Sequence, residues 1–406
     1  MRRRHGKVRQ SPLEWGVRLA LVAVVLVLAY VGIAFSMARL VYRSDPARGY
    51  ALAPFDGRIT ATLAAKRIES GTSVADRRSA VNLARLALRQ DPTAVFAFST
   101  LGLDSEVRGD IPGAKKYFGG AQRLSRRNLP TQLWSIEDAV RRGDIPGALR
   151  QYDITLRVMP ELWEVLFPVL AAASNNDDIR AALVPTLSAG SSWGPFFLEF
   201  LAKNSPDPRA TTKLFTALQR AGHPPSAATQ AGIVDKLVDI GLYDDAWAYY
   251  TTFRRGADRR QSRDPDFLAN VRAASKFDWQ PVETDGVVAT LQDGILDVSV
   301  LANSGGAVVR QMQLLPPGTY RLDGRTNGID PASDAQSYWV LTCQSGREIG
   351  RTPLLRPHDT SGRFEGMFTV SSECPVQTLT LIVRPSESTD RLAGQIDRAR
   401  LTAVGR

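Results

Sequence analysis

Seven residues, RGDIPGA, occur twice in this chain, at 108–114 and again 34 residues later at 142–148. A repeat of this length suits a pair of antiparallel helices that stacks on its own copies, because one pair alone cannot bury its apolar side. Glycine readily ends a helix, and aspartate followed by proline readily begins the next. The heptapeptide therefore predicts a turn, with the glycine ending one helix and the aspartate capping the next: Gly109 and Asp110, then Gly143 and Asp144.

Other residues recur in the same register and extend it to three units, at 61–94, 95–128 and 129–162. Small residues let the two helices of a unit approach closely, and aromatic residues fill the space between units. The residues in these positions are Ala80, Gly102, Ala114, Phe118, Ala148 and Tyr152. The pattern resembles the tetratricopeptide repeat (TPR) family. The resemblance implies an α-solenoid whose groove binds a protein partner.

Further helical pairs follow less regularly at 163–187, 193–221 and 227–253. In the last pair Ala246 takes the small position of the second helix. These units depart from the family pattern at most signature positions, so the number of true TPR hairpins after residue 162 stays open. The sequence predicts a TPR-like α-solenoid over residues 45–262.

An uncharged run of 20 residues, 19–38, precedes the repeats. A helix of about 20 residues spans about 30 Å, the thickness of the hydrocarbon core of a bilayer. Residues 1–18 carry six basic side chains against one acidic side chain, and basic flanks stay in the cytoplasm. We therefore expect a single-pass protein of the bacterial inner membrane, with a cytoplasmic tail at 1–18, a membrane helix at 19–38 and the bulk of the chain in the periplasm.

A cleaved signal peptide is the alternative to this anchor. Its apolar region is about 7–15 residues long and ends at a small-x-small site. Ala34-Phe35-Ser36 is a poor version of that site, and the apolar run is longer, so we expect a retained helix.

The two cysteines of the chain, Cys343 and Cys374, fit an oxidising compartment. An even pair in an exported domain favours a disulfide, whereas the same pair in the cytosol would stay as free thiols. The alternative is two buried, apolar cysteines. We expect the disulfide.

The composition changes after residue 262. Residues 263–276 are charged and contain proline, which predicts a linker. Residues 277–406 contain seven or eight β-rich runs between turn residues, as is typical of an antiparallel sandwich. PPGTYRL and IDRARLTAV in this part resemble a jelly-roll domain of the carbohydrate-binding type. The expected fold class is thus a multi-domain chain with a transmembrane helix, an α-solenoid and a C-terminal jelly-roll-like β-sandwich.

Alternation within SYWVLTC places Trp339, Leu341 and Cys343 on one face, which we expect to be the core. An aromatic ring elsewhere on the sandwich can pack on the C–H side of a sugar. The candidates for glycan contact are Trp279, Tyr320 and Tyr338. The alternative is that these rings cover the edges of the sandwich.

No residue pattern predicts catalysis, a metal or a cofactor. His5, His223 and His358 are far apart, and no spacing matches a zinc site. GSSWG at 190–194 satisfies G-x-S-x-G but joins two expected helices, whereas a nucleophilic serine in this motif follows a strand. About half of the net charge of +10 lies in the tail, which leaves too mild a charge for a nucleic-acid binder. We expect no enzyme activity and no cofactor.

Two classes of function remain. The first is a periplasmic scaffold that binds an envelope protein through the TPR groove, as in accessory factors of envelope or exopolysaccharide assembly. The second is a glycan-binding module, with the sandwich on a cell-envelope polysaccharide and the solenoid as a spacer. A polar sandwich surface without aromatic rings favours the first class, and an exposed aromatic strip beside a groove favours the second.

The predicted topology is tested by reporter fusions placed after Arg263. A periplasmic enzyme fused there should be active, and a fluorophore that matures only in the cytoplasm should stay dark. The opposite pattern, or a mature N-terminus near Met37, would contradict a retained anchor.

Overall fold

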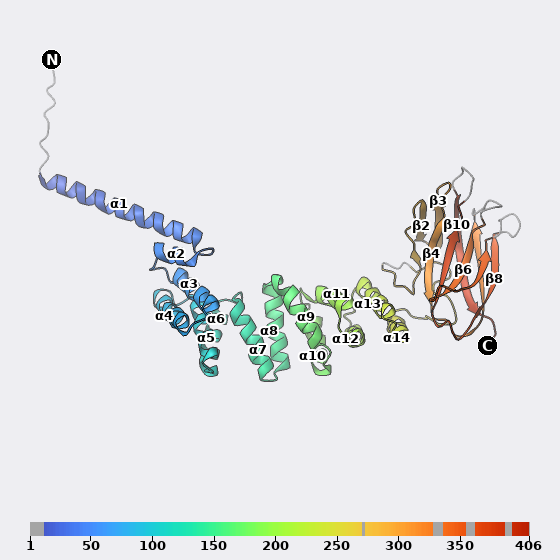
Figure 1. The fold of residues 1–406 in the computed structure, drawn as a ribbon, viewed down its shortest axis with the longest axis horizontal. Coiled ribbons are helices and arrows are strands. Elements are labelled where there is room, and N and C mark those ends of the chain that lie inside the picture. The colour runs from blue at the N-terminus through green and yellow to red at the C-terminus, as the bar shows by residue number, and fades with distance from the viewer. Residues whose placement is uncertain (1–11, 270–272, 328–335, 355–361, 386–391, 406) are drawn as a thin grey trace, which may run out of the picture. The chain divides into compact units, whose positions relative to one another are not determined.

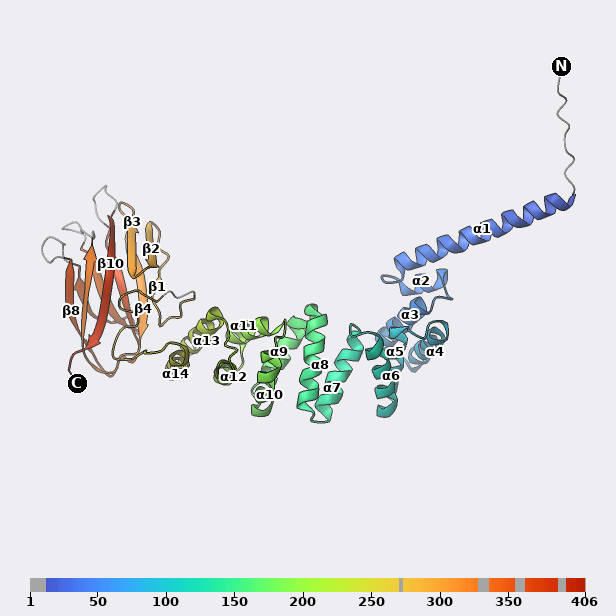
Figure 2. The ribbon, with the colours of Figure 1, turned by 180° about the vertical axis from the view of Figure 1, so that it is seen from behind.

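The structure, a computed structural model, consists of helices followed by a β-sandwich, in agreement with the predicted fold class (Figure 1, Figure 2). It describes residues 12–269, 273–327, 336–354, 362–385 and 392–405. Most of the predicted tail at 1–18, together with His5 and His358, lies outside these residues. The chain divides into two compact units, Met1–Trp163 and Glu164–Arg406.

Helix α1 (Pro12–Val41) contains the predicted membrane segment and extends beyond it at both ends. Its stretch Glu14–Val41 is long and apolar enough to cross a membrane, by length and composition. Two helices follow after short turns, α2 (Pro46–Leu52) and α3 (Gly57–Ser70). Helix α2 was not predicted as a separate element; Asp45 caps it, and proline occupies its first turn.

The end of α1 packs against α2 and α3. Ala38 is fully buried, and the ring of Phe35 stacks on Phe55 with 6.2 Å between centroids. Arg39 pairs at 2.9 Å with Asp56, whose carboxylate also caps α3. The apolar helix therefore enters the first folded unit directly, through apolar contacts and an ion pair.

Six helices of the first unit form three hairpins. They are α3, α4 (Val74–Gln90), α5 (Val95–Val107), α6 (Ile111–Leu124), α7 (Leu129–Arg141) and α8 (Ile145–Val158). Helices α5 and α7 begin 34 residues apart, as the repeat predicts. Helix α3 begins earlier than the expected start at 61, because Asp56 accepts hydrogen bonds from the first N–H groups at Arg58 and Ile59.

Both copies of RGDIPGA form the predicted turn. Gly109 and Gly143 have φ values of 73° and 66°, in the left-handed region that glycine adopts without steric cost. In the first copy Asp110 accepts a hydrogen bond from the N–H of Gly113 at 2.9 Å, and the second copy repeats this bond at 2.8 Å. The heptapeptide is thus helix-turn chemistry in both places.

The small and aromatic residues of the repeat lie inside the hairpins. All seven that the sequence singles out are buried: Ala80, Gly102, Ala114, Phe118, Ala148, Tyr152 and Ala246. A Cβ on Gly102 would lie 2.9 Å from atoms of the Phe118 ring. That ring in turn stacks on Trp134 of the next hairpin, with 4.7 Å between centroids. Glycine at 102 therefore leaves room for the ring that joins two hairpins.

Three more helical pairs follow, as the less regular part of the sequence predicts. They are α9 (Trp163–Ala173) with α10 (Asp177–Ser188), α11 (Gly194–Asn204) with α12 (Pro208–Arg220), and α13 (Ala227–Asp239) with α14 (Tyr243–Phe253). Between α9 and α10 the side chain of Asn176 caps the second helix, and two aspartates occupy its first turn. The second unit begins within α9.

Ten strands form two antiparallel sheets, in the orders β1-β4-β9-β6-β7 and β2-β3-β10-β5-β8 (Figure 1). Their bounds are β1 Gln280–Pro281, β2 Val287–Gln292, β3 Ile295–Val300, β4 Gly306–Gln313, β5 Gly318–Asn327, β6 Tyr338–Cys343, β7 Glu348–Pro353, β8 Arg363–Val370, β9 Gln377–Val383 and β10 Leu392–Ala403. The sequence predicts seven of them. The three others, β1, β2 and β7, are all edge strands.

The core of the sandwich lies between the two sheets. Trp339 and Leu341 are fully buried and Cys343 nearly so, which confirms the predicted core face of β6. The ring of Trp339 lies 6.4 Å from that of Phe364, which belongs to the other sheet. Val340, on the opposite face of β6, is also buried.

The predicted linker at 263–276 is not a solvated tether in its described part. Just before it, the N–H of Ser262 donates to the carbonyl of Leu401 at 2.8 Å, and the N–H of Leu401 donates back to the Ser262 hydroxyl at 3.0 Å. The N–H of Ala399 likewise donates to the carbonyl of Pro265 at 2.8 Å. The segment thus follows β10 and belongs to the sandwich.

Arg263 joins this segment to the last helix of the array. Its side chain is buried, 5.3 Å from the ring of Trp247 on α14 and 5.5 Å from that of Phe277. The guanidinium donates to the backbone carbonyls of Phe277 and Met312. Burial lowers the pKa of Arg263 to about 10, which still leaves the group charged at neutral pH.

Carboxylates complete the contact between α13, α14 and the sandwich. Asp235 accepts a hydrogen bond from the backbone N–H of Lys276 at 2.7 Å, and Asp278 accepts one from the Tyr250 hydroxyl at 2.8 Å. Burial raises the pKa of Asp235 to about 6, with smaller contributions from Asp239 and Asp278. The contact therefore contains a carboxyl group whose ionisation opposes folding.

Gly102→Ala tests the fit between hairpins. The new methyl group must displace the Phe118 ring, which is buried and stacked, so the free energy of unfolding should fall by roughly 1–3 kcal/mol. Gly119→Ala is the matched control, because the nearest atom to its added methyl group would belong to the Arg123 side chain of the same helix, at 3.9 Å. It should stabilise the helix by roughly 0.5–1 kcal/mol. Urea unfolding of the protein in detergent measures both, and equal effects would contradict the assigned register.

Asp235→Asn tests the buried carboxyl group. The amide keeps an acceptor for the Lys276 N–H but does not ionise. Because the folded-state pKa is raised, ionisation costs stability as pH rises from the unfolded value of 3.8 through about 6. The unfolding free energy of the variant, relative to wild type, should therefore increase by about 1–3 kcal/mol between about pH 4 and pH 7. A difference that does not change with pH would contradict this assignment.

Candidate functional site

An open cavity of about 990 Å³ lies on the outer face of sheet β2-β3-β10-β5-β8. Strands β5, β8 and β10 form its floor, and the turn between β2 and β3 contributes Asp293 and Gly294. Asp266 and Leu268, from the segment that follows Arg263, complete the lining. We call this cavity the sandwich groove.

The floor of the sandwich groove is charged because alternate residues of each strand point outward. On β5 the outward residues include Asp323 and Arg325, between the buried Leu322 and Thr326. On β8 they include Arg363 and Glu365. Antiparallel strands bring such outward residues together in rows that cross the sheet.

The strand register places like charges opposite each other in the sandwich groove. Arg325 on β5 faces Arg363 on β8 and Arg398 on β10, so three arginines form one row. In the next row Asp323 faces Glu365 on β8 and Arg400 on β10. Like charges directly opposite each other destabilise a sheet, and such an arrangement therefore points to a ligand that compensates it.

Only part of this charge is compensated within the described residues. Arg325 pairs with Asp397 at 2.7 Å, and Arg398 pairs with Asp266 at 2.6 Å. The hydrogen bond to Asp397 raises the pKa of Arg325 above its ordinary value. Across the described ranges no ion pair involves Arg363 or Glu365. These two side chains are the ones open to a partner.

Two of the three predicted glycan-contact residues lie in the core instead. Trp279 is 4% exposed and donates its indole N–H to the carbonyl of Asp264 at 2.9 Å. Tyr320 is 2% exposed and donates its hydroxyl to the carbonyl of Pro316 at 2.8 Å. Neither ring has a face open to a sugar, because both fill the space between the sheets.

The third candidate, Tyr338, is half-buried, and its ring is covered. The guanidinium of Arg351 lies 4.6 Å from the ring centroid and also donates to Glu348 at 2.6 Å. No phenylalanine, tyrosine or tryptophan of the described part of the sandwich is exposed. The structure therefore does not bring the three candidates together as a stacking surface.

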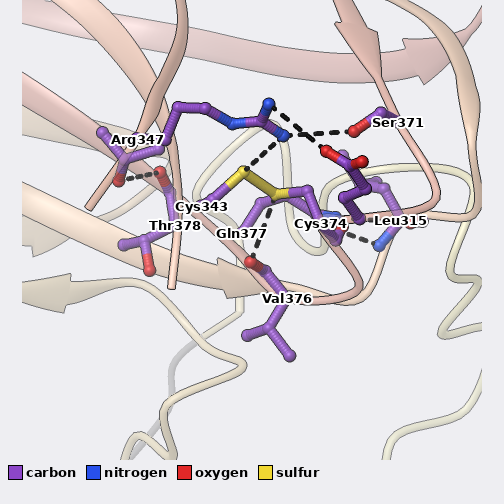
Figure 3. The surroundings of a disulfide bond; sticks show 10 residues. Leu315, Cys343, Arg347, Ser371, Cys374, Val376, Gln377 and Thr378 are labelled. Carbon is purple, nitrogen blue, oxygen red and sulfur yellow. Dashed lines mark hydrogen bonds and ion pairs between the residues drawn. A yellow bond between two sulfur atoms is a disulfide. The ribbon is translucent and has the colours of Figure 1, made fainter. Parts of the chain in front are cut away.

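Cys343 and Cys374 form a disulfide, with 5.6 Å between their Cα atoms. Figure 3 shows the guanidinium of Arg347 beside the bond, where it donates to the Ser371 hydroxyl at 3.2 Å. The bridge links the end of β6 to the turn before β9, its neighbour in the sheet. The chain between the cysteines contains β7 and β8, which belong to different sheets. The disulfide thus closes a loop that passes through both layers.

The motif GSSWG joins α10 and α11, as the sequence predicts. The serine at 192 is exposed, and the tryptophan after it is buried against the aromatic cluster of Phe167 and Phe197. No group of three or more His, Cys, Asp or Glu side chains in the described ranges is arranged to hold a metal.

The arginine row was missed by sequence reasoning. Its members alternate with apolar residues in RLDGRT, RFEGMF and DRARL, so each strand showed charged outward positions. The alignment of the three strands, which turns separate charges into a row, is a long-range property of the sheet.

No family model and no curated protein matches the chain. Among solved structures, it is similar to TmCBM61 in complex with beta-1,4-galactotriose, at 16% identity and a TM-score of 0.24, over 35% of this chain and 97% of that one. It is also similar to the arabinose-bound MgGH51 α-L-arabinofuranosidase, at 13% identity and a TM-score of 0.28, over 37% of this chain and 27% of that one. The structure of Naa15/Naa10 bound to HypK-THB is similar at 15% identity and a TM-score of 0.25, over 56% of this chain and 40% of that one. At these values the likeness carries no functional argument.

Proposed function

We propose that this chain is a membrane-anchored periplasmic scaffold of the TPR type that binds an envelope protein and is not an enzyme. The pathway we propose is envelope or exopolysaccharide assembly, in which it would act as an accessory factor. The observation that carries the proposal is the sandwich groove, where like charges face each other and no aromatic ring is exposed.

The packing of α1 supports a retained anchor. A peptidase that cleaved after Ser36 would remove Phe35, which stacks on Phe55, and would leave the buried Ala38 as the second residue of the remaining chain. That part of the helix is folded against α2 and α3 and is not an extended substrate. The basic tail then places the folded units on the periplasmic side.

The hairpins support the TPR assignment. Their 34-residue register, the glycine at 102 and the buried alanines are the features that let such hairpins stack. Stacked hairpins of this kind offer long binding surfaces to proteins, and we assign the protein partner to this array.

The sandwich groove suits a partner with charged side chains. Arg363 can donate two parallel hydrogen bonds to a carboxylate of the partner, while Glu365 on the same strand can bind a lysine or arginine. Both signs lie within one groove, which fits a polypeptide better than a neutral sugar. Sugar recognition on a sandwich would instead use exposed aromatic rings, which the described residues lack.

A glycan that carries charge remains the second candidate for the same groove. The open arginine Arg363 and the row of Arg325 and Arg398 could bind the acidic groups of a cell-envelope polysaccharide. In that case the helical array would act as a spacer.

Photo-crosslinking in living cells separates these functions. A benzoyl-phenylalanine in place of Leu268, an exposed residue that lines the sandwich groove, should yield one discrete adduct that protease removes. The same residue in place of Thr369, an exposed position on β8 outside the lining, is the control and should yield none. Arg363→Glu, an exposed change that leaves the core intact, should abolish the adduct.

The nature of the adduct decides between the two candidates. A polydisperse, protease-resistant adduct that depends on Arg363 would assign the groove to a polysaccharide and overturn the scaffold. Adducts of equal yield at Leu268 and Thr369, insensitive to Arg363→Glu, would overturn both.

A further inference from the structure

The hairpin nearest to the membrane helix carries a second groove, of about 620 Å³. Helix α4 supplies most of its lining, together with part of α3 and Tyr50 of α2. Its charged residues are all arginines: Arg67, Arg78 and Arg89. No acidic side chain lines it among the described residues, in contrast to the mixed charges of the sandwich groove. We call it the arginine groove.

Arginines line up along the exposed side of α4. Arg78, Arg85 and Arg89 are spaced at seven and four residues, which places them on one face of a helix with Asn82 between them. All four side chains are exposed. Like charges four residues apart, as at 85 and 89, destabilise a helix, so the alignment does not serve the fold.

These arginines also differ from others in the array by lacking acidic partners. Arg108, Arg142 and Arg157 each pair with an aspartate four residues earlier on the same helix. In the part of the chain that the structure describes, the side chains of Arg78, Arg85 and Arg89 make no ion pair and no hydrogen bond. Their positive charge is therefore available to an anionic ligand.

The floor of the arginine groove is apolar and continuous with the membrane anchor. Leu63, Leu83 and Leu86 line it beside the arginines. Tyr50, at its rim, packs in the same cluster as Ala38 at the end of α1. Tyr50 thus belongs both to the lining of the groove and to the apolar cluster at the C-terminal end of α1. Arginines beside an apolar floor match the chemistry of a phospholipid, in which an anionic headgroup is joined to acyl chains.

We propose that the arginine groove binds the anionic phospholipid headgroups of the leaflet that the C-terminal end of α1 reaches. The contact would hold the first hairpin against the bilayer surface, in addition to the tether that α1 supplies. The inference rests on the membrane anchoring proposed above. Charge complementarity and continuity with the anchor favour lipid over a soluble acidic polymer, which becomes an outcome of the test.

The test uses the full chain in neutral detergent micelles and short-chain lipids as probes. Native mass spectrometry counts bound phosphatidylglycerol and phosphatidylcholine over a titration of each. The wild type should bind phosphatidylglycerol at least about tenfold more tightly, since each arginine near an anionic surface contributes a factor of about five. R78Q/R85Q/R89Q should lose that preference while keeping the helical circular dichroism of the wild type.

R123Q/R126Q/R127Q is the matched control. It removes the same charge from three exposed arginines at the end of the next hairpin, and it should keep the preference. Equal loss in both triple variants, or no preference in the wild type, would overturn the proposal. Binding of polygalacturonate that needs Arg78, Arg85 and Arg89, without binding of phosphatidylglycerol, would reassign the groove to an acidic polymer.

The anchor is measured separately, by whether the chain stays with membranes after an alkaline carbonate wash. Release in that wash would contradict the proposed anchoring, whatever the micelle titration shows. Retention together with no lipid preference would overturn only the arginine groove.

Discussion

A buried cation, Arg263, holds the sandwich to the last helical pair. A charge removed from water is costly unless its surroundings replace the lost hydration. Here two backbone carbonyls accept its hydrogen bonds, and the rings of Trp247 and Phe277 lie within cation–π distance. Neither α14 nor the sandwich satisfies the guanidinium alone. The helices and sheets after residue 163 accordingly belong to one compact unit. Asp266, which follows Arg263 by three residues, lines the sandwich groove, so the buried arginine lies close in sequence to that groove.

Local patterns made the helical part predictable. Turn chemistry in RGDIPGA, together with the register of small and aromatic residues, depends only on neighbours within one repeat, and the caps and buried residues follow it. In the sandwich, the central strands and one edge strand, β8, were predictable. Edge strands β1, β2 and β7 were missed because an edge strand needs less apolar burial to stay in place, and its sequence then resembles a loop. The linker prediction failed for a similar reason: charged composition does not reveal that one arginine, Arg263, is buried.

Site residues were harder to predict than elements. Aromatic side chains were assigned to a sugar because a ring serves equally well as a stacking surface or as core filling, and only the depth of Trp279 and Tyr320 decides between them. Both grooves described above contain aligned arginines. On the sheet their alignment depends on pairing between distant strands, whereas on α4 it follows from helical spacing alone. The alignment on α4 was therefore visible in the sequence. That these arginines have no acidic partners could be learned only from the structure.

The place of β10 within its sheet has a kinetic consequence. This strand comes last along the described chain, yet it lies in the centre of the order β2-β3-β10-β5-β8 and pairs with both β3 and β5. Until it arrives, the sheet exists as two separate fragments with open edges, exposed to pairing with other chains. A chain that crosses the membrane from its N-terminal end delivers this strand after all the others. In the proposed periplasmic topology, the sandwich would therefore close only once β10 has crossed the membrane, and the two fragments would keep open edges until then.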